Sequence, residues 1–220
     1  MDYKFSGAGT IPAGEYEAVK VSGAAKLAGD VRCTSLSASG SFGGSGSITC
    51  SGGVHFSGST GIDGPISAGE LKASGSFKCK GLRGGDLRVS GSARVDGDME
   101  GDAIRVSGSI NCSGLINADR IEIHIGGVSS AGSIGGSEIS VYSENRSGGL
   151  SRILFGKNPH GAMNVEESIE GDDIFLEYVT CPTVIGRRVT VGPGCRIGSV
   201  QYSESAEISP EARVDDCRQV

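Results

Sequence analysis

A short pattern of apolar and polar positions recurs between residues 19 and 143. In each copy two apolar residues flank a polar one and are followed by Ser-Gly, as in Val19-Lys20-Val21-Ser22-Gly23. Side chains that alternate with a period of two are typical of a β-strand. The six clearest copies close at glycines spaced 16 to 18 residues apart, namely Gly23, Gly40, Gly58, Gly75, Gly91 and Gly108. The pattern therefore predicts short strands that recur about every 17 residues.

Two further apolar positions follow each closing glycine. One lies four residues later, at Leu27, Ile62, Cys79, Val95 and Cys112; the copy that starts at Gly40 departs from it, with Phe42 two residues and Gly44 four residues later. The other lies about eight to ten residues later, as at Val31, Cys33, Ile48, Cys50, Ile66, Ala68 and Met99. Three short strands per turn predict an all-β, single-stranded parallel β-helix. Each turn buries too little to be stable alone, so about a dozen turns should stack about 4.8 Å apart.

The repeat weakens after Tyr142. Residues 145–149 read as a loop, 152–155 as an isolated strand and 174–179 as a resumed strand. We therefore expect a lead-in over residues 1–18, a regular β-helix over 19–143, and a less regular continuation or cap over 144–220.

Composition and charge narrow the functional classes. The chain has 38 Gly among 220 residues, no Trp and a formal net charge of -6. An acidic chain is a poor candidate for binding DNA or RNA, whose phosphates require a basic surface. No run of about 20 apolar residues could cross a bilayer, and the opening residues lack the pattern of a secretory signal. The odd number of cysteines, seven, favours reduced thiols. We expect a soluble, cytoplasmic protein.

The repeated Val-Ser-Gly units occur together with Gly-Asp-apolar steps, at Gly29-Asp30-Val31, Gly85-Asp86-Leu87 and Gly97-Asp98-Met99. In these features the chain resembles the bactofilins, a family of bacterial cytoskeletal proteins, and in particular the longer forms of spore-forming Gram-positive bacteria. The resemblance implies a right-handed β-helix that assembles end to end, without nucleotide, into filaments. It also implies a scaffold for cell shape, cell-wall or motility machinery. The partners would be further copies, cell-wall or flagellar proteins, and the inner face of the membrane.

A hexapeptide-repeat acyltransferase is the alternative. Three hexads begin at Ile185, Val191 and Ile197. That family folds into a left-handed β-helix with 18-residue turns and uses a catalytic histidine. The hexads here are few and contain no histidine, and the main period is nearer 17 residues, so we rank this interpretation second.

The cysteines fit a structural role. Cys33 and Cys50 are spaced to lie on adjacent turns, whereas Cys79 and Cys112 should lie two turns apart, too far for a disulfide. Neither a Cys-x-x-Cys pair nor a paired-histidine spacing occurs, so no metal site is expected. Buried apolar filler is the favoured interpretation.

The remaining polar candidates for a functional site are also predicted to lie on the surface. His55 and His124 each lie between two apolar residues and should point outward, and His160 lies in a predicted turn. The carboxylates from Asp96 to Asp102 could serve a sugar-cleaving β-helix enzyme, but a solvated outer face is favoured. The Gly43–Gly46 stretch lacks the helix and Lys of a phosphate-binding loop. We therefore expect no catalytic, cofactor-binding or metal-binding residue, no cofactor and no enzyme activity.

Overall fold

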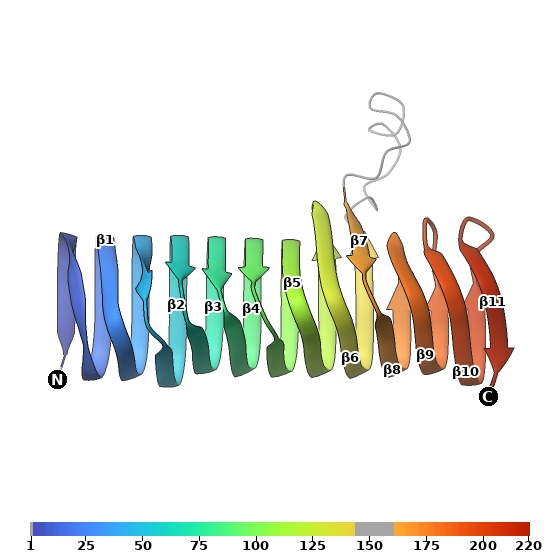
Figure 1. Cartoon of the computed structure of the whole chain (residues 1–220), viewed down its shortest axis with the longest axis horizontal. Helices are drawn as coiled ribbons and strands as arrows, with labels where there is room; N and C mark the ends of the chain where they lie inside the picture. Colours follow the sequence, from blue (N-terminus) through green and yellow to red (C-terminus); the bar gives the residue numbers. More distant parts are fainter. Residues whose placement is uncertain (1, 144–160) are drawn as a thin grey trace, which may run out of the picture.

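The computed structural model describes residues 2–143 and 161–220, which form a long rod of stacked coils (Figure 1). Eleven strands belong to one sheet, and every pair of neighbouring strands is parallel. The sheet winds into a β-solenoid of about ten turns with about 17 residues per turn, so the predicted fold class is confirmed. The loop and strand expected at 145–149 and 152–155, and His160, lie outside the described residues. The strands are β1 (Tyr3–Ser45), β2 (Ile48–Ile62), β3 (Pro65–Cys79), β4 (Gly81–Val95), β5 (Met99–Ile125), β6 (Val128–Ser143), β7 (Ala162–Val165), β8 (Ser168–Leu176), β9 (Val179–Val191), β10 (Arg196–Ile208) and β11 (Arg213–Gln219).

The strands are longer than the short segments expected from the repeat, because they continue around the corners of the coil. β1 alone has 43 residues, more than two turns. Corner glycines make this possible. Gly58 has a φ of +111°, and a Cβ built on it would lie 2.3 Å from the carbonyl oxygen of Gly40 on the turn below. Only glycine combines this backbone conformation with such a close approach. The same corner is occupied by a column of glycines with positive φ, namely Gly7, Gly23, Gly40, Gly58, Gly75, Gly91 and Gly108.

The inward side chains form continuous columns along the axis. Leu71, Leu87 and Ile104 are register partners in β3, β4 and β5, and each is fully buried. All the apolar positions predicted to point inward between Leu27 and Cys112 are buried. These columns form one core along the rod, in which every turn packs only against the turns next to it.

Three phenylalanines form a stack inside this core. Phe42, the residue that departs from the repeat, has its ring centroid 5.6 Å from that of Phe56, which lies 5.9 Å from that of Phe77. Phe56 occupies the column of Ala38 and Ala73, which belong to the turns that carry Phe42 and Phe77. Each of these turns therefore combines a large ring with a small residue, which keeps the cross-section of the core constant.

Residues 161–220 continue the same sheet. β7 and β8 both pair with β6, and β9 pairs with β7 and β8. Among the hexad residues, Val191 and Ile197 are buried, whereas Ile185 points outward. In this region Cys181 pairs with Ile197, sixteen residues later, and Val191 pairs with Ile208, seventeen residues later.

Candidate functional site

In two of the Gly-Asp steps the aspartate carboxylate accepts hydrogen bonds from the following turn. The carboxylate of Asp30 accepts bonds from the backbone N–H and the hydroxyl of Ser47, at 2.7 and 2.9 Å. The carboxylate of Asp98 accepts the backbone N–H of Leu115 at 2.9 Å. The bonds from Ser47 lower the pKa of Asp30 below its ordinary value, because they favour the charged carboxylate. These aspartates therefore have a structural use, the capping of a backbone donor on the following turn.

The run of carboxylates from Asp96 to Asp102 lies on the outer face, as predicted. Glu100 forms an ion pair with Arg83 on the preceding turn, at 2.6 Å. Within residues 2–143 and 161–220, no group of three or more His, Cys, Asp or Glu side chains is placed to hold a metal ion. No helix in the same residues is long and apolar enough to cross a membrane.

The cysteines lie in the predicted registers. Cys33 is the register partner of Cys50, while Val95 separates Cys79 from Cys112. All seven are free thiols, and only Cys217, on the last strand, is exposed. Burial raises the pKa of Cys33 and of Cys79 to about 12, because a thiolate would lose its hydration. The thiols of Cys33 and Cys79 are therefore protonated and poor nucleophiles.

His55 and His124 both point outward, as predicted. His124 has its Nε2 atom 2.7 Å from a carboxylate oxygen of Glu122, and its ring stacks on that of Tyr142 with centroids 5.2 Å apart. The stack continues from Tyr142 to Phe175, with centroids 5.1 Å apart. We call the half-buried rings of Tyr142 and Phe175 the aromatic ridge.

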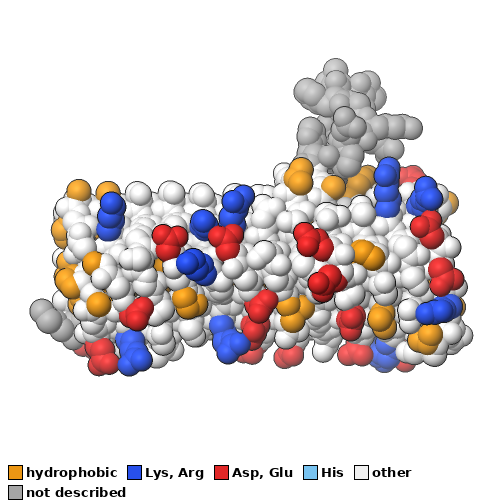
Figure 2. Space-filling model, viewed as in Figure 1, with side chains coloured by type: hydrophobic (Ala, Val, Ile, Leu, Met, Phe, Trp, Pro, Cys, Tyr) orange, Lys and Arg blue, Asp and Glu red, His pale blue; other side chains and the backbone are white. Residues whose placement is uncertain are grey.

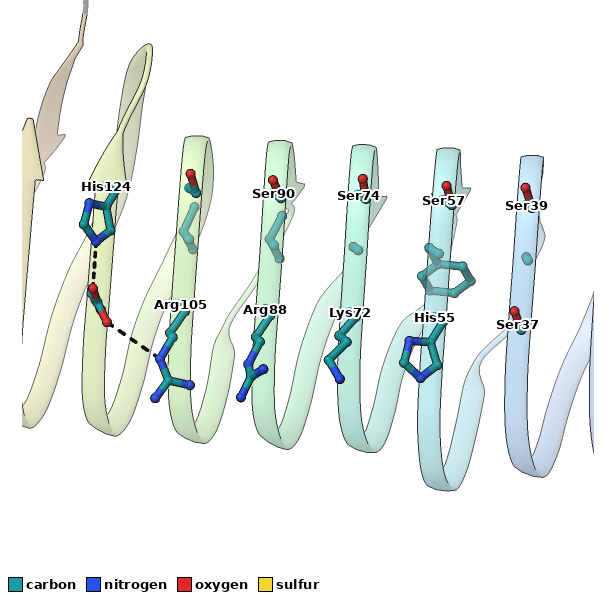
Figure 3. A pocket seen from close by; sticks show the side chains of 17 residues that line it. Ser37, Ser39, His55, Ser57, Lys72, Ser74, Arg88, Ser90, Arg105 and His124 are labelled. Carbon is teal, nitrogen blue, oxygen red and sulfur yellow. Dashed lines mark hydrogen bonds and ion pairs between the residues drawn. The ribbon is translucent and has the colours of Figure 1, made fainter. Parts of the chain in front are cut away.

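An open groove of about 580 Å³ runs along the rod on the same face (Figure 3). We call it the axial groove. One side is a row of long polar side chains from successive turns, His55, Lys72, Arg88 and Arg105. The other side is a column of serines, Ser39, Ser57, Ser74, Ser90 and Ser107. The short serines leave the groove open, and it stops where His124 takes the place of serine.

The cations of the axial groove already have carboxylate partners. Lys72 pairs with Glu70 at 2.7 Å, and Arg88 pairs with Asp86. Arg105 pairs with Asp86 at 3.4 Å, and with Glu122 at 3.7 Å (Figure 3). The groove is thus lined by ion pairs and hydroxyls and holds no concentrated positive charge for a free anion.

The N-terminal face of the rod is formed by aromatic residues of the first coil. The rings of Tyr3 and Tyr16 meet edge to face with centroids 5.5 Å apart, and both pack against the core. Phe5 lies over Gly9, where a Cβ would meet its ring. Hydrophobic side chains accordingly reach the surface at this end of the rod (Figure 2).

The C-terminal face is the exposed side of the last coil. Val200 and Val191 are buried, but the residues that pair with them one turn later, Cys217 and Ile208, are exposed. Val214, which pairs with buried Ile197, is half-buried. β1 and β11 stand at the two ends of the strand order, so the outer edge of each has no partner strand within the described residues.

The sequence of the chain is similar to those of two Bacillus subtilis (strain 168) proteins. It is 30% identical to the uncharacterized protein YhbF over 89 residues, which is 40% of this chain and 34% of YhbF. It is 35% identical to the uncharacterized protein YhbE over 101 residues, 46% of this chain and 40% of YhbE. The chain thus matches well under half the length of either relative. No known family model matches the chain, and no solved structure matches it significantly.

Sequence reasoning missed the axial groove and the aromatic character of the N-terminal face. A signal for the groove was present, because the residue between the two apolar positions of each repeat is long in the copies from His55 to Arg105. Its partner across the groove is the serine of each Ser-Gly unit. The tyrosines of the first coil gave no such signal, because they precede the regular repeat.

Proposed function

We propose that this protein is a structural, non-enzymatic protein whose copies join end to end through the terminal coils into filaments, without nucleotide. In this proposal the solenoid is right-handed, as in the bactofilins that the repeat resembles. The filament lies in the cytoplasm, at the inner face of the membrane or near it. There it acts as a scaffold for cell-shape, cell-wall or motility proteins.

The proposal is supported by the side chains and strand edges that the two terminal coils expose. At the C-terminal face, Ile208, Val214 and Cys217 occupy inward columns, and no further coil among the described residues covers them. At the N-terminal face, Tyr3 and Tyr16 present aromatic rings. Each face also carries a strand edge that pairs with no other strand of the described residues. Such an edge can hydrogen-bond to another chain.

End-to-end contact would extend the interactions that already hold the rod together. A coil of one copy that stacks on the terminal coil of another buries apolar columns and pairs strand edges, as consecutive turns do. No energy source is needed, because the joint repeats the contacts of the fold. The proposed assembly therefore requires no nucleotide.

The acyltransferase alternative has less support. The hexad region makes turns of fifteen to seventeen residues, not eighteen. His55 and His124 lie on one outer face, and His124 is bonded to Glu122. We therefore propose that the chain has no active site.

The first experiment compares the wild-type protein with Val214→Asp, by sedimentation and electron microscopy without nucleotide. We expect the wild type to pellet as filaments. A buried carboxylate at the joint should prevent contact through the C-terminal face, because burying an unpaired charge is strongly unfavourable. If filaments alternate N-to-N and C-to-C contacts, the variant stops at dimers, and if they join N to C, it stops at monomers.

The matched control is Ser92→Asp, which adds the same charge at an exposed position in the middle of the rod. It should form filaments like the wild type. Circular dichroism would show that both variants keep their β-structure. A wild type that remains monomeric, or a Val214→Asp variant that assembles normally, would contradict the proposal.

A further inference from the structure

The Ser-Gly corner of the solenoid is bordered on both sides by basic side chains. In β3 and β4 a cation stands three residues before the corner glycine and another three residues after it. Lys72 is the register partner of Arg88, and Lys78 is the register partner of Arg94. The cations therefore form two rows along the axis, one on each side of the corner, and the first row is seen beside the serines in Figure 3.

The same arrangement extends to the first coils of the rod. Lys20 and Lys26 stand three residues before and after Gly23, which belongs to the column of corner glycines with positive φ. Both lysines are exposed. We call the corner from Gly7 to Gly108, together with its two rows, the basic edge. Its cations are Lys4, Lys20, Lys26, Lys72, Lys78, Arg88, Arg94 and Arg105.

The basic edge has more cations than nearby carboxylates. From Lys4 to Asn111, a stretch that the structure describes throughout, the two rows carry no carboxylate. Lys20, Lys26 and Arg94 form no ion pair within residues 2–143 and 161–220. The other five cations form ion pairs with carboxylates outside this stretch of the rows, namely Asp2, Glu70, Asp86, Asp96 and Glu122. The edge is therefore net positive, although the whole chain is acidic.

The surface between the two rows consists of small residues. The corners from Gly40 to Gly108 read Ser-Gly-Ser, and those at Gly7 and Gly23 read Ser-Gly-Ala. With about 4.8 Å between turns, the corners form a line about 29 Å long, and the rod is straight over this length (Figure 1). Small side chains let this line approach a flat surface closely, while the longer lysines and arginines reach the same surface from both sides.

We propose that the basic edge binds the anionic surface of a lipid bilayer, with the Ser-Gly corners in the headgroup layer and the cations on lipid phosphates at either side. This inference rests on the proposed function, because it names the part of the rod that meets the inner face of the membrane. A free anion would meet one or two cations of the axial groove, which already have carboxylate partners. A plane meets the whole edge at once, and anionic lipids attract such clusters of basic residues.

A membrane suits the basic edge better than a nucleic acid. The two rows lie on faces that diverge from a straight corner, and the phosphates of a bilayer are present on both sides of such a line. A double helix carries its phosphates on curved paths, which a straight edge crosses but does not follow. A flexible strand that wraps around the rod would meet the carboxylates of the other faces, such as Asp30, Asp98 and Glu100.

The test measures flotation of the protein with lipid vesicles, which separates bound protein from filaments that sediment by themselves. One vesicle preparation is phosphatidylcholine, and the other contains phosphatidylglycerol as well. We expect binding to the anionic vesicles at low salt, little binding to the neutral ones, and release at high salt because salt screens exposed charges. Filaments should bind more tightly than the Val214→Asp variant, because several linked copies can contact one vesicle.

The decisive variant combines Lys20→Glu, Lys26→Glu and Arg94→Glu, which reverses the three cations of the basic edge that have no ion pair to lose. It should weaken binding to anionic vesicles by about a hundredfold or more, since each basic residue near such a surface contributes roughly fivefold. Circular dichroism and electron microscopy should show that it keeps its fold and still forms filaments.

The matched control combines Arg32→Glu, Lys80→Glu and Arg83→Glu. It changes the net charge by the same amount at exposed positions outside the two rows. It should weaken vesicle binding far less, because charges more than about 10 Å from the membrane are largely screened.

Four results would overturn the proposal. They are no binding of the wild type to anionic vesicles at low salt, equal binding to neutral vesicles, equal losses in the two triple variants, and tighter binding of single-stranded RNA by the same three cations. Each result leaves end-to-end assembly standing, because filaments are observed without lipid. Conversely, vesicle binding by a wild type that forms no filaments would contradict the proposed assembly and leave the basic edge supported.

Discussion

At the scale of the residue, the corner glycines decide whether successive turns can stack. The column from Gly23 to Gly108 combines positive φ with contact between backbones, so no side chain fits there. Gly61 differs, because a Cβ built on it would meet nothing within 4 Å. Its register partner one turn later is Lys78. Glycine is therefore a requirement at the corner and only an option at Gly61.

Gly58→Ala should destabilise the protein by about 2 kcal/mol or more, because Ala at positive φ is strained and its Cβ meets the carbonyl of Gly40. Gly61→Ala is the control and should be neutral or slightly stabilising. Urea unfolding followed by circular dichroism measures both. Equal unfolding midpoints for the two variants would show that the corner does not constrain its residue.

At the scale of the element, the core is shared between turns. The rings of Phe42, Phe56 and Phe77 belong to three consecutive turns, and Phe56 touches both neighbours. Ala38 and Ala73 make room for the ring of Phe56 within their column. The strands β1, β2 and β3 therefore depend on each other for packing as well as for hydrogen bonds.

Phe56→Ala should lower the free energy of unfolding by about 3 to 5 kcal/mol, because it empties the middle of the stack. Phe56→Leu keeps most of the volume and should cost less than about 1.5 kcal/mol. Thermal and urea unfolding of the two variants provide the comparison. A cost for Ala no larger than that for Leu would mean that the ring is not part of a close-packed core.

At the scale of the whole molecule, the rod has a uniform middle and two different ends. Each turn contacts only its neighbours, so the terminal coils are the places where inward residues remain uncovered. Cys217 is the exposed thiol of the C-terminal face, whereas the six other cysteines are buried. This contrast gives a chemical probe of the end of the rod.

In unassembled protein at mild alkaline pH, one thiol should react rapidly with a maleimide or a disulfide reagent, and six should be protected. Burial holds the pKa of the thiols of Cys112, Cys181 and Cys195 at about 11, so few thiolates form there. Cys217→Ser should remove the fast reaction. Assembly through the C-terminal face should also slow it. Several fast-reacting thiols in the native protein, or full reactivity of Cys217 in filaments, would count against this arrangement.

Periodicity made most of the fold predictable. The inward positions of the repeat, from Val19 to Cys112, are buried because alternation and turn length together fix which side chains point inward. The axial groove was harder to predict, because it depends on which outward residues are neighbours across turns. Lys72 and Arg88 are sixteen residues apart in the chain but are register partners in the sheet. The aromatic ridge was still harder to predict from the sequence, because Tyr142 and Phe175 are 33 residues apart and meet only through the pairing of β6 with β8.

The sequence by itself determined the parallel solenoid, its period of about 17 residues and the identity of its inward columns, because a repeat that cannot bury its own core has to stack on its copies. The tertiary structure alone decided that Asp30 and Asp98 cap backbone donors on the next turn and that strands continue around their corners. It also decided that one face carries both a groove and a ridge. These features depend on the register between turns, which for most adjacent turns varies from 15 to 19 residues and sets the neighbours of the outward side chains.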